Sequence, residues 1–320
     1  MFDVKDKKIL SELMLDARIP ITKLAKKVGV SREVANYRIK KLEEKQTIKG
    51  YYVLVNYEAL GFSRQVIFLQ LKGVNSKQEK EIINKIANHE YTTYLSPIIG
   101  KWNVVFDILT KNEKMLEKVV KEIITPIQQY VDSFILITSN TKGEFFPTKF
   151  LGIKKDNESV NKTTKPYELD DLDKNILREL SKNARTDYIL LSNKLDVPAT
   201  TIAFRVKKLQ KNNILQGSTI SIDYKHFGWD FYNLQLKSQN TNLKEFFEFV
   251  KEHNNIIFYY EYLGHENWDI DLGIIAKNTE ELKEILIEIK QKFGEEIQIQ
   301  NMYAVSNLLK DNIVPEGVLK

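Results

Sequence analysis

Apolar residues recur at helical spacing three times within the first fifty positions of the chain. These stripes predict helices over residues 6–15, 22–28 and 31–44, and their inward positions are Ile9, Leu10, Leu13, Met14, Ala35, Ile39 and Leu42. A glycine turn separates the second helix from the third, and the hydroxyl of Ser31 is suited to cap the third helix. Tyr51–Val55 is β-branched and aromatic, which predicts a strand. Together these elements predict a winged helix-turn-helix, whose last helix enters the major groove of DNA.

Beyond residue 62 the pattern alternates between strands and helices. The predicted elements are Gln65–Lys72, Ser76–Asn88, Thr92–Ile99, Trp102–Thr110, Glu113–Ile124 and Val131–Ser139. Their order, β-α-β-β-α-β, is typical of a ferredoxin-like antiparallel sheet with helices on one face. The other face of this sheet carries Val66, Phe68, Leu109 and Phe134, so we expect a partner sheet to cover it.

The whole pattern returns 167 residues later. From Asp6 to Gly61, 18 of 56 positions are identical without a gap, and Arg38–Leu42 returns as Arg205–Leu209. A second helical unit is expected over 173–211 with a strand near 219–222. It is followed by the elements Asp230–Lys237, Asn242–His253, Ile256–Leu263, Trp268–Ile275, Thr279–Lys292 and Ile297–Val305. The polar stretch 152–165 is almost free of large apolar residues and predicts a linker.

The sequence therefore predicts an α+β chain with two winged helix-turn-helix domains and two ferredoxin-like βαββαβ domains in tandem. The expected boundaries are a first winged domain over 1–62, a first βαββαβ domain over 63–150, a linker over 151–168, a second winged domain over 169–229 and a second βαββαβ domain over 230–320. If the two sheets pack face to face, the chain forms an intramolecular pseudo-dimer.

Composition narrows the class of protein further. The 320 residues include no cysteine, which excludes disulfides and thiolate sites, and no apolar run is long enough to span a membrane. The start of the chain lacks the core of a signal peptide, so we expect a cytoplasmic protein. The net charge is +5, and residues 1–50 carry 13 Lys and Arg against 7 Asp and Glu. The basic excess thus concentrates in the first helical unit, as a contact with nucleic acid would need.

Several short motifs resemble the Lrp/AsnC (feast/famine) family of transcription regulators. They are Asp6, Ile9-Leu10, Ala17-Arg18, Leu24-Ala25, Val30-Ser31, Arg38–Glu43, Ile48–Gly50 and Gly61, and the βαββαβ half resembles that family's effector-sensing and dimerisation domain. The resemblance covers almost the whole chain twice. It implies a prokaryotic regulator of transcription with double-stranded DNA as its partner. Family members usually pair single units, and their dimers often associate further, so two units in one chain imply a pseudo-dimer with scope for self-association.

The resemblance also implies an effector site, with an amino acid as the effector. In the family this site involves the glycine loop between the two central strands, which here supplies Gly100, Trp102, Asn103, Gly264, Trp268 and Asp269. The family usually has an acidic residue after the aromatic one. The first unit departs from this pattern with Asn103, whereas the second keeps Asp269 in a loop two residues longer.

The outward positions of the third helix are the candidate DNA-binding residues. Arg32, Glu33 and Asn36 are expected to contact base edges. Arginine can form two hydrogen bonds with guanine, and asparagine can form two with adenine. Further candidates are Ser31 and Tyr37, the phosphate-binding Arg18, Lys40, Lys41 and Lys49, and in the second unit Thr200, Thr201, Lys207 and Lys208. Ala203 and Phe204 can contact only a thymine methyl group, so we expect the two units to read DNA unequally. Arg38 and Arg205 lie beside the apolar stripe and are expected in internal ion pairs.

Two other functions share these features. The four histidines form no close metal-binding pair, and no phosphate loop or serine elbow is present, so we expect no enzyme and no cofactor. Sirohaem decarboxylases, however, resemble Lrp/AsnC proteins, and Tyr259–Tyr262 beside His265 offers a place for a tetrapyrrole. The third reading is a co-regulator that binds protein rather than DNA.

Overall fold

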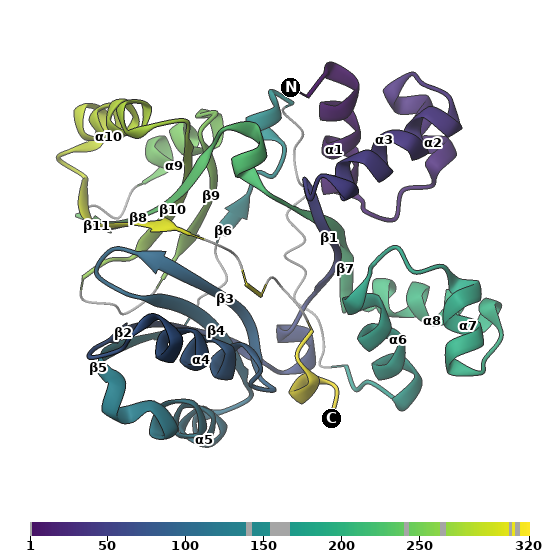
Figure 1. Cartoon of the computed structure of the whole chain (residues 1–320), viewed down its shortest axis with the longest axis horizontal. Helices are drawn as coiled ribbons and strands as arrows, with labels where there is room; N and C mark the ends of the chain where they lie inside the picture. Colours follow the sequence, from purple (N-terminus) through teal and green to yellow (C-terminus); the bar gives the residue numbers. More distant parts are fainter. Residues whose placement is uncertain are drawn as a thin grey trace.

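Two groups of helices lie on one side of the molecule and two helix-covered sheets on the other (Figure 1). The computed structural model describes residues 2–138, 143–153, 167–239, 243–262, 267–306, 309–310 and 314–320. The predicted α+β architecture is confirmed, while most of the predicted linker lies outside the described residues. None of the helices in the described ranges combines the length and the apolar character that a membrane span needs.

Each group of helices, which we call a head, consists of three helices followed by one strand. The first head contains α1 (Val4–Leu15), α2 (Ile21–Val28), α3 (Arg32–Glu44) and β1 (Ile48–Val55); the second contains α6 (Asp171–Lys182), α7 (Tyr188–Leu195), α8 (Ala199–Lys211) and β7 (Leu215–Ile222). Arg38 ties α3 to the start of α1, with Nη1 2.7 Å from carboxylate oxygens of both Asp3 and Asp6. Arg205 contacts Asp170 and Asp173 in the same way, so both predicted internal ion pairs are confirmed.

The heads are joined by an antiparallel ribbon of β1 and β7, in which Tyr51 pairs with Ile220 and Val53 with Ser218. β7 is longer than the strand predicted near 219–222. The first helix of each head packs on the strand of the other, α1 on β7 and α6 on β1. A single cluster of buried residues therefore runs through both heads, and the hydrophobic effect holds them together as one body.

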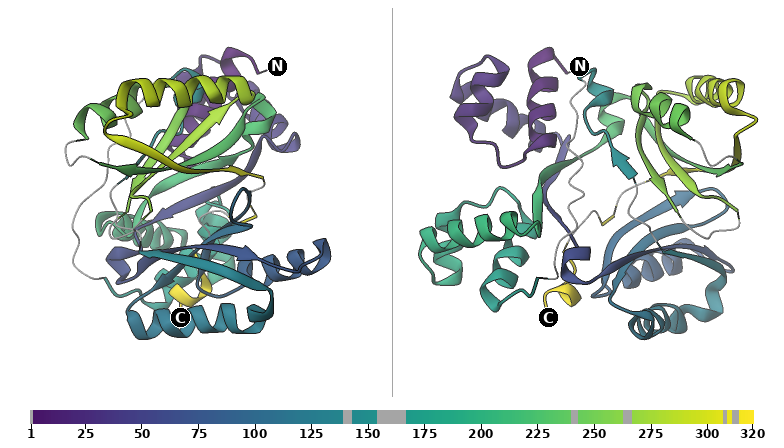
Figure 2. Two further views of the ribbon diagram at one scale, coloured as in Figure 1. Left: turned by 90° about the vertical axis from the view of Figure 1, so that its left-hand side faces the viewer. Right: turned by 180° about the vertical axis from the view of Figure 1, so that it is seen from behind.

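Each sheet with its helices forms what we call a platform. The first contains β2 (Ser63–Leu71), α4 (Ser76–Ala87), β3 (Thr92–Ile99), β4 (Val104–Thr110), α5 (Glu113–Ile124) and β5 (Val131–Thr138); the second contains β8 (Asp230–Ser238), α9 (Lys244–Glu252), β9 (Ile256–Glu261), β10 (Ile270–Ala276), α10 (Thr279–Phe293) and β11 (Ile297–Val305). Short 3-10 turns follow β1, α5 and β7, at Glu58–Leu60, Thr125–Tyr130 and Tyr224–Phe227. The helices cover the outer faces, and the two sheets face each other (Figure 2).

The strands run in the order β5-β2-β4-β3-β11-β8-β10-β9-β6, so the platforms also meet edge to edge at β3 and β11. Between the facing sheets, the ring of Phe68 lies 5.6 Å from that of Trp268 and 5.8 Å from that of Tyr303. The expected burial of Val66 and Phe68 against a partner sheet is confirmed. Leu109 is buried as well, but in the core of the heads. The prediction for Phe134 is wrong: it lies on the edge strand β5 and is 40% exposed.

A group of polar side chains is buried in the same interface. The Nε of Arg64 lies 3.4 Å from a carboxylate oxygen of Asp107, and its guanidinium lies 5.2 Å from the ring centre of Tyr260. Asp271 on β10 is 2% exposed and pairs along the strands with Gln235. Buried carboxylates of this kind are costly unless they are paired or protonated.

The segment after each platform crosses to the other platform. β6 (Gly143–Phe145) pairs with β9. Lys149, at the start of the turn Lys149–Leu151, donates to the main-chain oxygens of Val250 and His253 at the end of α9 and of Ile256 at the start of β9. The C-terminal turn η5 (Glu316–Val318) runs the opposite way, and its Gly317 N–H donates to the main-chain oxygen of Glu90 after α4.

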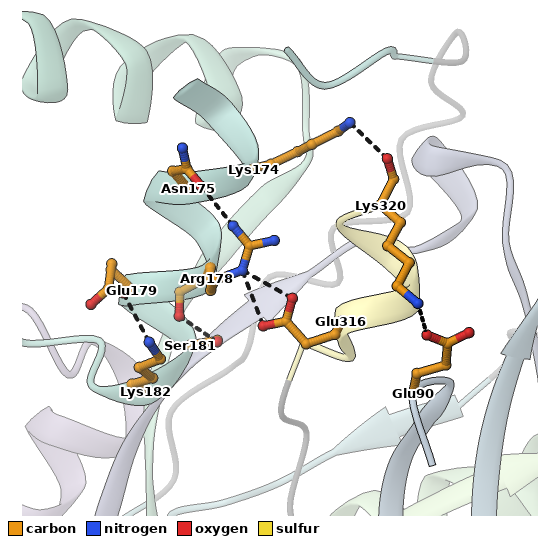
Figure 3. A network of polar contacts seen from close by, with 9 residues as sticks. All are labelled: Glu90, Lys174, Asn175, Arg178, Glu179, Ser181, Lys182, Glu316 and Lys320. Atoms are coloured by element: carbon orange, nitrogen blue, oxygen red, sulfur yellow. Dashed lines mark hydrogen bonds and ion pairs between the residues drawn. The ribbon is translucent and has the colours of Figure 1, made fainter. Parts of the chain in front are cut away.

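The C-terminal segment also binds the second head. The guanidinium of Arg178 on α6 donates to both carboxylate oxygens of Glu316, at 3.0 and 2.9 Å, and Lys174 donates to the main-chain oxygen of Lys320 (Figure 3). The side chain of Lys320 forms an ion pair with Glu90 of the first platform. This segment therefore connects the second head to the first platform, a connection that the periodicity of the sequence does not indicate.

Candidate DNA-binding interface

The outer surface of α3 carries a set of exposed polar side chains. The predicted cap is present, since the hydroxyl of Ser31 accepts a hydrogen bond from the N–H of Val34 at 3.2 Å. The exposed residues are Arg32, Glu33, Asn36, Tyr37, Lys40 and Lys41, while Ala35, Ile39 and Leu42 are buried. Hydrogen bonds from its own N–H and from Ser31 hold the pKa of Glu33 below its usual value. Glu33 therefore remains an ionised acceptor, able to take a hydrogen bond from a cytosine amine.

The equivalent surface of the second head is less polar. Thr200 is exposed and Thr201 half-buried, but Asn36 is replaced by Ala203 and Tyr37 by Phe204, which is 65% exposed. Ile189 and Leu190 on α7 add further apolar area, at 64% and 63% exposed. α8 begins after Pro198, which supplies no side-chain cap. The two heads thus share a backbone layout and differ in surface chemistry.

Three of the predicted DNA-contacting cations have partners within the protein. Arg18 donates to the main-chain oxygens of Ala184 and Thr186 in the second head. Lys49 forms a 3.0 Å ion pair with Asp223, and a hydrogen bond with Tyr167 raises the pKa of Lys208. A phosphate would have to compete with these contacts, so Arg18, Lys49 and Lys208 are weaker candidates for phosphate binding than a cation that faces solvent.

The remaining basic residues face solvent. Lys40 and Lys207 are exposed on α3 and α8, and Lys41 lies 6.0 Å from the ring centre of Tyr37. The 3.8 Å contact between Lys40 and Glu44 joins two exposed groups, so it is easily exchanged for a phosphate. These three lysines remain the predicted phosphate contacts.

The residues predicted for an effector site are engaged in packing. Trp102 and Trp268 are each 3% exposed and lie in the core between the sheets. Asn103 accepts a hydrogen bond from the N–H of Leu71 at 2.7 Å, and Asp269 accepts one from that of Ser238 at 2.8 Å. These side chains hold the ends of β2 and β8. Gly100 is exposed, and Gly264 lies outside the described residues.

The histidines lie where helices end. His89 and His253 follow α4 and α9, and their Nε2 atoms lie 3.3 Å from Glu122 and 3.4 Å from Glu288. Among the residues that the structure describes, no three His, Asp or Glu side chains are grouped to hold a metal ion. His265, which the tetrapyrrole reading invoked, lies outside the described residues.

Comparisons with known proteins identify the family. The profile of the AsnC-type helix-turn-helix domain matches residues 2–43, and that of a winged helix-turn-helix DNA-binding domain matches residues 169–216. The transcriptional regulator LrpA of Pyrococcus abyssi is 34% identical over 122 residues, which is 38% of this chain and 84% of that protein. LrpA of Pyrococcus horikoshii is 39% identical over 97 residues, 30% of this chain and 66% of that protein. The chain belongs to the Lrp/AsnC family of helix-turn-helix transcription regulators.

Each of these relatives aligns with less than half of the chain, whereas two solved structures of one protein cover nearly all of it. The sirohaem decarboxylase NirDL superposes with a TM-score of 0.63, and its complex with an iron-uroporphyrin III analogue with 0.64. Each alignment covers 97% of this chain and 94% of that one, at 14% and 13% sequence identity. At this identity the likeness concerns the fold.

Proposed function

We propose that this chain is a sequence-specific DNA-binding regulator of transcription whose two heads bind one duplex, as the two subunits of a family homodimer would. The observation that carries the proposal is the exposed polar surface of α3, which presents Arg32, Glu33 and Asn36 to solvent. Support for the pseudo-dimer comes from the β1–β7 ribbon and the core shared by both heads. The regulator is proposed to act without catalysis.

The two heads are expected to recognise unlike half-sites. Arg32 and Asn36 suit a half-site with guanine and adenine edges in the major groove. On α8, Ala203 and Phe204 offer apolar contact, which suits thymine methyl groups, and Thr200 adds a hydroxyl for a single hydrogen bond. The operator proposed for this protein is therefore asymmetric.

The test is selection of bound sequences from random DNA, followed by titration of the best duplex. Arg32→Ala should weaken binding by about 10- to 100-fold, since a two-bond base contact is worth ~1–3 kcal/mol. Thr200→Ala is the comparison substitution on α8 of the second head, at the position equivalent to Glu33, and should cost about fivefold, the effect of one neutral hydrogen bond. Equal losses would reject the asymmetry. A protein that selects no sequence, and whose binding does not weaken as salt increases, would contradict the proposal as a whole.

The apolar surface of the second head favours a second candidate role for that head, the docking of a protein. Ile189 and Leu190 on α7 and Phe204 on α8, two helices that pack on each other, present apolar groups to solvent. Phe204→Ala distinguishes the two roles. If α8 reads thymine methyl groups, the substitution weakens binding to the selected duplex. If the surface docks protein, DNA binding is unchanged.

Two further readings can be tested on the same preparation. The amino-acid effector remains a prediction, and equilibrium dialysis with the twenty amino acids tests it. The likeness to a sirohaem decarboxylase motivates a titration with iron-uroporphyrin. We expect no shift of the Soret band, and a saturable shift would favour a tetrapyrrole-binding function instead.

A further inference from the structure

Two arginines at equivalent positions of the heads each reach into the other head. Arg18 follows α1, and its Nη1 donates to the main-chain oxygen of Ala184 and, at 3.0 Å, to that of Thr186. Its guanidinium lies 4.6 Å from the ring centre of Tyr188 at the start of α7. Arg18 therefore binds the turn between α6 and α7, directly before the helix-turn-helix motif of the second head.

Arg185, 167 residues later, makes the reciprocal contacts. Its Nη1 donates to the main-chain oxygen of Ala17 at 3.0 Å, and its guanidinium lies 5.3 Å from the ring centre of Tyr51. Planar guanidinium groups are suited to this combination of hydrogen bonding and stacking, which a lysine cannot reproduce. The hydrogen bonds to Ala184 and Ala17 are related as the heads are, whereas the ring partners Tyr188 and Tyr51 differ. Because the two bonds cross between the heads in opposite directions, together they oppose sliding and rotation of one head against the other.

The main chain adds to this connection. The N–H of Ala17 donates to the oxygen of Ser218, and that of Ala184 donates to the oxygen of Tyr51, at 3.1 and 2.9 Å. These bonds fasten each turn to the β1–β7 ribbon, and the arginines fasten each turn to the other head. The position of α3 relative to α8 is thus set within the protein before any DNA is bound.

We infer that Arg18 and Arg185 are positioning residues that set the spacing between the two half-sites of the operator, an inference that rests on the proposed function. One inserted base pair moves a half-site by about 3.4 Å along the helix axis and rotates it by about 35°, since a turn holds about 10–10.5 base pairs. A rigid pair of heads cannot follow both changes. The arginines therefore act on the choice of operator without contacting a base.

The experiment uses the full chain and a set of duplexes in which the selected half-sites are moved apart or together by one or two base pairs. The wild-type protein should lose about tenfold or more in affinity per step, the loss that follows from misplacing even one base contact. In the double variant Arg18→Ala/Arg185→Ala the ribbon and the shared core still join the heads, but the side-chain bonds that oppose small shifts of one head against the other are lost. The fold-loss in affinity for a shifted half-site should therefore be at least about threefold smaller than in the wild type, because part of each base contact is recovered.

Control variants separate positioning from charge and from folding. Arg18→Lys/Arg185→Lys keeps both charges and removes the forked, stacked contact, so it should broaden the spacing profile as well. If circular dichroism shows that the double alanine variant does not fold, the double lysine variant replaces it in the experiment. Arg32→Ala, in the proposed base contact, should weaken all spacings alike and keep the ratio between them.

Each outcome separates the inference from the proposed function. A folded double variant with the wild-type spacing profile overturns the positioning role while leaving DNA binding intact. If the wild-type protein itself prefers no duplex, the proposed function fails, and the inference fails with it.

Discussion

Replacement of Asp271 by valine should stabilise the protein at neutral pH and destabilise it in acid. Asp271 is 2% exposed and lies opposite Gln235 on the neighbouring strand. In the first platform the equivalent pair is Val105 and Phe68. Valine therefore already occupies this place in the repeated fold, and the substitution introduces no side chain that the sheet has not accommodated elsewhere.

The magnitude follows from the titration of the carboxyl group. Burial raises the pKa of Asp271 from 3.8 to about 8, although a hydrogen bond with Tyr262 and the charge of Arg64 act in the opposite direction. Above pH 3.8 the unfolded chain releases a proton that the folded protein retains. The folded state therefore loses stability as the pH rises, until the folded pKa is passed. At pH 7 this cost is about 4 kcal/mol, at ~1.4 kcal/mol for each pH unit.

The valine variant avoids this cost but leaves the hydroxyl of Tyr262 without its acceptor, a loss of about 1–3 kcal/mol. The net expectation is a gain of about 1–3 kcal/mol at pH 7 and a loss of about 1–3 kcal/mol near pH 4, where the folded protein holds the proton and the unfolded chain has only begun to release it. The difference between variant and wild type thus changes sign with pH, which a simple packing effect cannot produce.

Urea unfolding at steps of about one pH unit from pH 4 to 8 measures this difference, because the titration of groups common to both proteins cancels. Asp107→Val is the matched control, since it removes the ion-pair partner of Arg64 from the same interface. It should destabilise the protein by about 3 kcal/mol, the lower end of the range for a broken buried pair, because Arg64 keeps some exposure. Parallel stability curves for Asp271→Val and the wild type between pH 4 and 8 would refute the reasoning.

Two further changes test the connections between the halves. Phe68→Ala removes a fully buried ring from the inter-sheet core and should lower the free energy of unfolding by about 3–5 kcal/mol in urea titrations; a loss below about 1 kcal/mol would show that the sheets do not depend on this contact. Arg178→Ala breaks the exposed ion pair with Glu316 and should cost about 0.2–1 kcal/mol, less in high salt, with a double-mutant cycle against Glu316→Ala as the measurement. A coupling energy of zero at low salt would contradict the proposed attachment of the C-terminal segment.

The positions of the helices and their caps follow from local sequence. Ser31 caps α3 because a hydroxyl directly before an apolar stripe can accept a hydrogen bond from the N–H of Val34. The ion pairs of Arg38 and Arg205 also follow, since each arginine lies beside the buried stripe and needs a carboxylate nearby. The repeat extends these local expectations to the second half of the chain.

The same local pattern does not reveal what a polar side chain contacts. Arg18 at an exposed turn is equally suited to a phosphate and to main-chain oxygens, and the second head supplies the oxygens of Ala184 and Thr186. The return of Ala17-Arg18 as Ala184-Arg185 was a signal that could have indicated the reciprocal contact. Lys49 likewise finds Asp223, a residue from the other head.

By itself, the sequence determined the elements, their order and their repetition, because apolar periodicity and caps act within a few residues. The family was indicated separately, by the short motifs that resemble it. Only the tertiary structure decided which surfaces meet. It decided that Trp102 and Trp268 enter the inter-sheet core, that Phe134 remains on an exposed edge, and that the segments after each platform cross to the other. The physical reason is that burial is non-directional: an apolar face favours being covered, but its composition does not specify which distant segment covers it.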